Sequence, residues 1–186
     1  AANPYAVKAG QKMLELGGSA VDAAIATQLV LTLVEPQSSG IGGGTFMMYF
    51  DSKSKSLTSF DGRETAPSNA DETLFLDKHG KAVKWIEAVV GGRSVGVPGI
   101  LDAFATAHKR YGKLEWQTLF SPAIELAEQG FIVSPRLHQL LAKELNPGVT
   151  KLPVIRDYFF PDGKPLAVGT VKKNPELAAL YKDIAK

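Results

Sequence analysis

The segment that most constrains the fold is A-V-D-A-A-I-A-T-Q-L-V-L-T-L-V, residues 20–34, which predicts a helix that is apolar on nearly every side. Ser19 can cap this helix, and Asp22 lies near the positive end of its dipole. A helix without a polar face has to be buried on most of its faces. Small residues at positions 23, 24 and 26 allow another layer to approach closely. The chain must therefore pack further elements on more than one side of residues 20–34.

Helix signals also occur before and after this segment. Residues 4–16 predict a first helix, which Gly17-Gly18 ends. Prolines, capping residues and glycines delimit four later helices, at about 98–110, 115–129, 135–145 and 174–186. The last of these patterns is still helical at residue 186 and has no capping glycine. We therefore expect a fragment or a processed subunit.

Extended segments are predicted between the helices. T-F-M-M-Y-F at 45–50 and S-L-T-S-F at 56–60 are typical of an antiparallel hairpin with a polar turn. Residues 88–99 are rich in valine and then in glycine, and we expect a strand-like segment there. Residues 71–87 show no regular pattern. This order favours an α+β fold over a doubly wound parallel sheet, with residues 1–186 as a single domain.

Composition argues against several kinds of function. The chain has no cysteine, which excludes disulfides, thiolate nucleophiles and zinc–thiolate sites. Its formal net charge is +2 without a basic stripe, so we expect no nucleic-acid partner. The three histidines, at 79, 108 and 138, lack the spacing of metal ligands, and we expect no metal and no cofactor. Thr27, Gln28 and Thr32 interrupt the longest apolar run, so no membrane span is predicted.

Two glycine-containing motifs resemble functional sites, a nucleotide-binding loop and a nucleophilic serine. The secondary structure predicted around each motif argues against that function. G-I-G-G-G at 40–44 follows a predicted helix and precedes a strand, the reverse of the order in dinucleotide-binding folds. We interpret these glycines as places where backbone layers, or a ligand, come close. G-R-S-V-G at 92–96 matches the G-x-S-x-G elbow, but no helix follows Ser94 at once. Only His138 lies well downstream to complete a triad, so Ser94 stays a rival nucleophile on the motif alone.

The stretch F-D-G-R-E-T-A-P, residues 60–67, places an arginine at the corner where the hairpin ends. A guanidinium is planar, permanently charged and able to donate two parallel hydrogen bonds to a carboxylate. A corner residue that a packed hairpin supports can be aimed accurately. Asp61 and Glu64 could orient the guanidinium or could simply neutralise it. From these residues alone, Arg63 is either a surface ion-pair partner or a carboxylate-binding group.

Five segments resemble, in the same order, the large subunit of the gamma-glutamyltransferase (gamma-glutamyl transpeptidase) family. They cover most of residues 1–140 and are L-G-G-S-A-V-D-A-A-I-A (16–26), E-P-Q-S-S-G-I-G-G-G (35–44), F-D-G-R-E-T-A-P (60–67), S-V-G-V-P-G (94–99) and Y-G-K-L-E-W-Q-T-L-F-S-P-A-I-E-L-A-E-Q-G-F (111–131). Residues after 145 match less distinctly. The resemblance implies the αββα layers of an N-terminal nucleophile hydrolase, with this chain as the N-terminal portion of the large subunit.

The resemblance also implies an acyl-transfer function. In this family a precursor cleaves itself, and the new N-terminal threonine of the small subunit attacks the γ-glutamyl carbonyl. The arginine of the family's D-x-R-E-x-A-P stretch binds the donor α-carboxylate, a role that falls to Arg63 here. No catalytic residue is then expected in this chain. The implied partners are the small subunit, glutathione or another γ-glutamyl donor, and an acceptor amino acid, peptide or water.

Some alternatives stay open within and beyond this family. Its members usually work in the periplasm or outside the cell, and we expect the same here. Relatives that depolymerise polyanions or deacylate cephalosporins share the fold, and the residues do not separate their substrates from those of transpeptidases. The rival functions are an α/β serine hydrolase that uses Ser94, and a non-catalytic scaffold of the same family.

Overall fold

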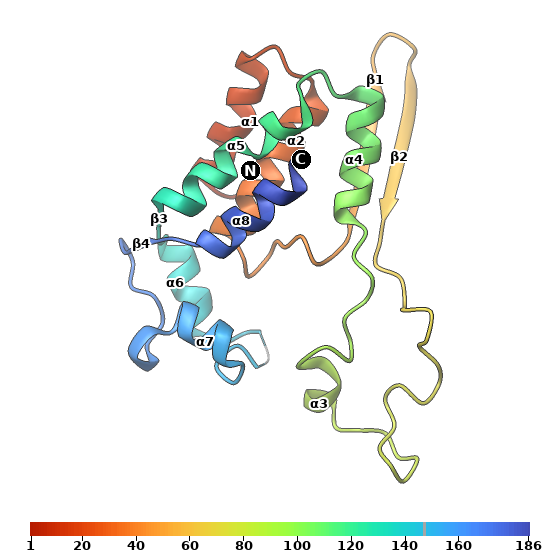
Figure 1. The fold of residues 1–186 in the computed structure, drawn as a ribbon, viewed down its shortest axis with the longest axis vertical. Coiled ribbons are helices and arrows are strands. Elements are labelled where there is room, and N and C mark those ends of the chain that lie inside the picture. Colours follow the sequence, from red (N-terminus) through yellow and green to blue (C-terminus); the bar gives the residue numbers. More distant parts are fainter. Residues whose placement is uncertain (147) are drawn as a thin grey trace.

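The computed structural model describes residues 1–146 and 148–186. It consists of a helical body, a hairpin beside that body, and a long irregular segment that extends from the hairpin (Figure 1). The helices are α1 (Pro4–Glu15), α2 (Ala20–Val34), α3 (Trp85–Val89), α4 (Ile100–Tyr111), α5 (Trp116–Gln129), α6 (Pro135–Ala142), α7 (Pro153–Phe159) and α8 (Pro175–Ile184). The strands are β1 (Thr45–Asp51), β2 (Ser56–Gly62), β3 (Phe131–Ile132) and β4 (Val171–Lys172), with a 3-10 turn at Pro161–Gly163. None of the helices in the two described ranges is both long and apolar enough to cross a membrane.

The apolar helix α2 forms the centre of the helical body, as its composition predicts. Helices α1, α5 and α4 all contact it, and α8 packs on α5. Gly10 of α1 lets the first two helices approach closely, because a Cβ at that position would lie 3.2 Å from the carbonyl oxygen of Ala23. The predicted cap by Ser19 is present at the start of α2, as part of a capping box: Ser19 Oγ accepts from the N–H of Asp22 at 3.2 Å, and Asp22 Oδ2 accepts from the N–H of Ser19 at 2.7 Å.

Helix α8 is tied to this centre by one buried tyrosine. Tyr181 is fully buried, and its hydroxyl donates to the carbonyl oxygen of Leu29 at 3.1 Å. Its ring meets the edge of Phe120, with 5.8 Å between the ring centroids. Burial raises the pKa of the Tyr181 hydroxyl to about 12. The C-terminal helix is therefore joined to α2 by both packing and a hydrogen bond.

Replacing Tyr181 with phenylalanine should lower the free energy of unfolding by about 1 kcal/mol at pH 7, because one buried hydrogen bond is lost. The folded pKa lies above the ordinary value of 10, so the tyrosine stabilises fully below pH 10 and loses that effect between pH 10 and about 12. Urea unfolding of the unmodified and Tyr181→Phe proteins, at pH 7 and at pH 11, measures the difference in their free energies of unfolding. This difference should be smaller at pH 11. An equal difference at both pH values would contradict the stabilising hydrogen bond of Tyr181.

The hairpin packs one face against α4, which runs alongside it (Figure 1). Its strands are antiparallel, with Thr45 opposite Gly62 at the open end. Tyr111 of α4 stacks on Tyr49 with ring centroids 4.0 Å apart, and its hydroxyl lies 3.0 Å from Thr58 Oγ1. Phe60 meets the same tyrosine edge-on, at 6.1 Å between centroids. These contacts fix the end of β2, where the chain continues into the predicted corner.

The opposite face of the hairpin is apolar and open to solvent. The exposed fractions of Phe46, Met48 and Phe50 are 67%, 69% and 56%. All three belong to β1, where they alternate with the side chains that face α4. The hairpin thus has one packed face and one apolar face that no described part of the chain covers.

Most predicted elements are confirmed, with ends that differ by one or two residues. Among the predicted helices, the one at 135–145 is the exception, because it stops at Ala142. Two residues later Glu144 has φ of 46°, a conformation that cannot continue a right-handed helix. Helices α3 and α7 and the β3–β4 pair were not predicted. In that pair Phe131 lies opposite Lys172. The two strands are therefore some forty residues apart in the sequence, and no local sequence pattern indicates that they pair.

The strand predicted at 88–99 is wrong. Helix α3 ends at Val89, and of the following residues only Val97 forms a β-bridge, an antiparallel one with Thr65. Gly91 has φ of 105°, which is outside the strand region, and Pro98 has no N–H to extend a ladder. Valine content indicated a strand there, but this segment has only a single bridged residue.

Candidate functional site

Arg63 follows the last residue of β2, at the corner that the sequence predicts. Its backbone N–H donates to Asp61 Oδ1 at 2.9 Å, which fixes the turn. Its guanidinium lies beside Glu64, with Nε 3.5 Å from Oε2. The Arg63 side chain is 72% exposed, and within residues 1–146 and 148–186 its guanidinium forms this one ion pair and no hydrogen bond. One side of the guanidinium thus faces a carboxylate, while its terminal amino groups remain open to a ligand.

Three backbone segments converge at Glu64, and glycines make this possible. A Cβ on Gly44 would lie 2.7 Å from the carbonyl oxygen of Gly62 and 2.6 Å from Glu64 Oε2, and one on Gly96 would lie 2.9 Å from Glu64 Cβ. A Cβ on Gly62 would lie 2.8 Å from the carbonyl oxygen of Gly99. Side chains do not fit at such distances. For Gly44, the interpretation that the G-I-G-G-G glycines admit close layers is confirmed.

Backbone hydrogen bonds join the same three segments. Gly99 and Ile100 both donate to the carbonyl oxygen of Gly43, at 3.2 and 3.3 Å. Thr65 and Val97 exchange two hydrogen bonds, at 3.3 and 2.8 Å. The corner that carries Arg63 is therefore supported by the packed hairpin on one side and by two cross-linked segments on the other. This support positions the backbone of Arg63, and Glu64, at 3.5 Å, restrains its exposed guanidinium.

Arg63 lines an open hollow of about 370 Å³ at this corner. Its walls are formed by Arg63, Glu64, Thr65, Ala66, Pro67, Leu74, Phe75, Arg93, Ser94, Val95 and Gly96. The ionisable residues in that wall are two arginines and one glutamate, so its formal charge is +1. Glu64 also lines a neighbouring polar hollow of about 480 Å³, with Ser38, Ser39 and Thr45. The arrangement is suited to binding an anion next to Arg63.

The geometry around Ser94 does not form a nucleophile elbow. Its Oγ donates to the carbonyl oxygen of Val89 at 3.3 Å, and the next helix starts only at Ile100. No histidine lines the hollow among the residues that the structure describes. His138, the expected triad partner, has its Nδ1 2.8 Å from the carbonyl oxygen of Leu166 instead. Ser94 thus has neither the turn nor the base that a serine nucleophile requires.

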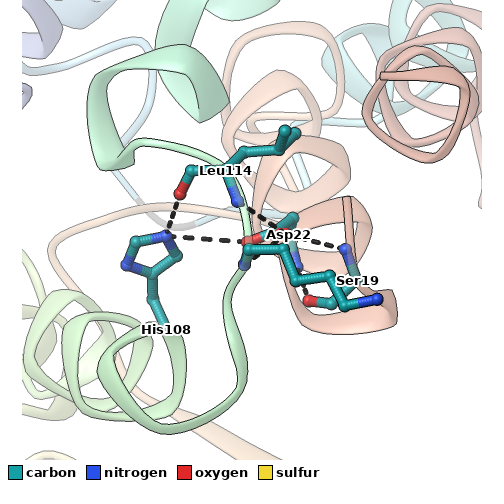
Figure 2. A network of polar contacts seen from close by, with 5 residues as sticks. Ser19, Asp22, His108 and Leu114 are labelled. Carbon is teal, nitrogen blue, oxygen red and sulfur yellow. Dashed lines mark hydrogen bonds and ion pairs between the residues drawn. The ribbon is translucent and has the colours of Figure 1, made fainter. Parts of the chain in front are cut away.

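Asp22 has a structural role that its capping position only partly predicts (Figure 2). Its fully buried carboxylate accepts at Oδ2 from the N–H groups of Ser19, Lys113 and Leu114, at 2.7, 2.9 and 3.3 Å. His108 Nε2 lies 3.6 Å from Asp22 Oδ1 and 2.8 Å from the carbonyl oxygen of Leu114. One carboxylate therefore caps α2 and also fixes the loop between α4 and α5.

Glu35 forms a second buried polar centre at the other end of α2. It accepts from Asn3 Nδ2 at 3.0 Å, from Gln37 Nε2 at 2.6 Å and from Arg136 Nε at 3.1 Å. These partners join the start of α1, the loop after α2 and helix α6. The sequence predicted no such role for Glu35, because Asn3 and Arg136 lie 32 and 101 residues away in the chain. Across residues 1–146 and 148–186, no group of three or more histidines, aspartates and glutamates could hold a metal ion.

Comparison with known proteins identifies the family. The model of the gamma-glutamyltranspeptidase family matches residues 6–186. The chain therefore belongs to the gamma-glutamyltranspeptidase family, and the resemblance of its five segments is confirmed. A glutathione hydrolase proenzyme of Bacillus subtilis is 40% identical over 183 residues, which is 97% of this chain and 30% of that protein.

Solved structures of the family share the fold. Gamma-glutamyltranspeptidase of Helicobacter pylori matches 100% of this chain and 52% of its own chain, with a TM-score of 0.91 and 33% identity. The enzyme of Pseudomonas nitroreducens, solved with L-DON, matches 100% of this chain and 53% of its own, with a TM-score of 0.88 and 35% identity. The α+β class and the N-terminal nucleophile hydrolase-like fold are confirmed. The chain spans less than a third of the curated relative and about half of these solved chains.

Proposed function

We propose that this chain is part of an enzyme that transfers or hydrolyses γ-glutamyl groups, and that Arg63 binds the α-carboxylate of the donor. The observation that carries the proposal is an exposed guanidinium on a well-supported backbone corner, beside a hollow of net positive charge, in a chain of this family. A carboxylate can accept two parallel hydrogen bonds from the terminal amino groups of Arg63. Glu64 restrains the guanidinium from its other side without occupying those groups.

The remaining chemistry falls to residues outside this chain. In the proposed enzyme the N-terminal threonine of a small subunit attacks the γ-glutamyl carbonyl, and this chain supplies no catalytic residue. The donor is glutathione or another γ-glutamyl amide, and an amino acid, a peptide or water accepts the acyl group. Residues 1–186 act as a single domain that needs the small subunit. We place the enzyme in the periplasm or outside the cell.

The complete protein tests this proposal. It should cleave itself into two subunits and release p-nitroaniline from γ-glutamyl-p-nitroanilide, whereas residues 1–186 alone should release none. Ser94→Ala should retain both activities within about twofold, because Ser94 Oγ is bonded to a backbone carbonyl and has no base.

Two outcomes would favour the rival functions. Loss of turnover in Ser94→Ala, together with an acylated serine in the unmodified protein, would support a serine hydrolase. A complete protein that neither cleaves itself nor acts on any γ-glutamyl amide would support the non-catalytic scaffold. Mass spectrometry of the intact subunits distinguishes these cases.

A further inference from the structure

Arg93 lies in the wall of the same hollow as Arg63, thirty residues later in the chain, and the proposed function gives it no task. It occupies the second position of the G-R-S-V-G motif, whose glycine and serine had suggested a different chemistry. We propose that Arg93 binds a second carboxylate of the donor. The protein would then prefer γ-glutamyl peptides whose departing part ends in a free carboxylate. This inference rests on the proposed role of Arg63.

An antiparallel bridge joins the two arginine segments. Thr65 and Val97 form it, two residues after Arg63 and four residues after Arg93, so the two arginines lie on opposite sides of the bridge along the paired segments. The segment of Arg93 turns tightly, since the N–H of Val95 donates to the carbonyl oxygen of Gly92 at 3.2 Å. Both arginines line one hollow, on opposite sides of the Thr65–Val97 bridge, whose hydrogen bonds stabilise the backbone between them.

The two arginines differ in how their charges are satisfied. Arg63 has Glu64 beside it, at 3.5 Å. Arg93 is exposed and has no ion pair or hydrogen bond from its side chain to any residue in the described part of the chain. An arginine in a ligand-sized hollow with no partner in the chain is a candidate anion-binding group.

Charge counting favours a donor with two carboxylates. The wall carries +1, from Arg63, Glu64 and Arg93. A γ-glutamyl amide with a neutral departing part has one ammonium and one carboxylate, so its net charge is zero. A γ-glutamyl peptide with a free C-terminus has one more carboxylate and a net charge of −1. Only the second kind of donor neutralises the hollow.

The size and lining of the hollow suit such a peptide. A tripeptide is about 10 Å long when it is extended, and a hollow of about 370 Å³ can hold much of it. Leu74 and Phe75 supply apolar wall for the middle of the ligand. The α-carboxylate would bind at Arg63 and the C-terminal carboxylate at Arg93.

Two donors with the same γ-glutamyl group provide the test in the complete two-subunit enzyme. Glutathione has a departing part with a carboxylate, and γ-glutamyl-p-nitroanilide has a neutral one. Arg93→Gln should raise the KM for glutathione about tenfold relative to the KM for the anilide, because one exposed charge-assisted contact is lost. Arg93→Lys should restore part of this ratio. Arg156→Gln is the matched control, since Arg156 is an exposed arginine that pairs with its neighbour Asp157.

An Arg93→Gln enzyme whose KM ratio equals that of the unmodified enzyme would overturn the inference. A KM that rises equally for both donors would overturn it too, because the effect would then not depend on the second carboxylate. Arg63→Ala, measured beside it, separates the two proposals. If Arg63→Ala leaves the KM for glutathione and the KM for the anilide unchanged, the proposed role of Arg63 is rejected together with that of Arg93. If Arg63→Ala raises both KM values, the role of Arg63 is supported, independently of the result for Arg93→Gln.

Discussion

Replacing Arg63 with alanine in the complete enzyme is expected to raise the KM for a γ-glutamyl donor about 30-fold or more. Truncating one partner of a hydrogen-bonded charge pair costs about 2–5 kcal/mol, and 1.4 kcal/mol corresponds to a factor of ten. The lower part of that range applies here, because the Arg63 side chain is 72% exposed in this chain. Steady-state kinetics with γ-glutamyl-p-nitroanilide measures the change.

The same variant should fold normally. The corner is held by the Thr65–Val97 pair and by the glycine contacts, neither of which uses the guanidinium. The midpoint of thermal unfolding should therefore change by no more than about 2 °C. Arg63→Lys should recover little of the affinity, since an ammonium cannot donate two parallel hydrogen bonds to one carboxylate. Arg156→Ala controls for the loss of a surface charge. A KM unaffected by Arg63→Ala would remove Arg63 from the donor site.

Replacing Asp22 with alanine is expected to have the largest effect on stability, a loss of about 3–5 kcal/mol in the free energy of unfolding. The change leaves the N–H groups of Ser19, Lys113 and Leu114 without their acceptor in a buried place. Each buried donor that loses its partner costs about 1–3 kcal/mol. Urea unfolding of the complete protein, followed by circular dichroism, measures the loss.

Two further variants show whether that loss comes from the buried network. Asp22→Asn keeps an acceptor oxygen and should lose less than Asp22→Ala. Asp157→Ala removes an exposed carboxylate whose ion-pair partner is its neighbour, and it should change stability by less than about 1 kcal/mol. Equal losses for Asp22→Ala and Asp157→Ala would show that the contacts in Figure 2 contribute little.

Much of the fold could be predicted where the signal is local. The apolar residues 20–34, the alternating hairpin and the capped helices all follow from spacing and turn residues that lie close together in the sequence. The failures involve partners far along the chain. Residues 88–99 have the composition of a strand but find a single bridge, at Val97, and the β3–β4 pair joins segments some forty residues apart.

The candidate site shows the same division. Arg63 could be located from its place after a predicted hairpin, and the family resemblance suggested its role. The glycine contacts around Glu64 and the shared hollow with Arg93 depend on three segments meeting in space. The second task of Asp22 depends on Lys113 and Leu114, more than ninety residues away. No local pattern in a single sequence indicates such contacts between segments that lie far apart along the chain.

The outward side of the hairpin has a consequence for making this chain on its own. Phe46, Met48 and Phe50 form an apolar strip on a ribbon of two strands, to which no third strand is added in the described part of the chain. Ribbons of this kind join to copies of themselves in water, edge to edge and face to face. Preparations of residues 1–186 alone should therefore be prone to precipitate. If the proposed small subunit covers this strip, synthesis of the two subunits together will yield more soluble material than residues 1–186 alone.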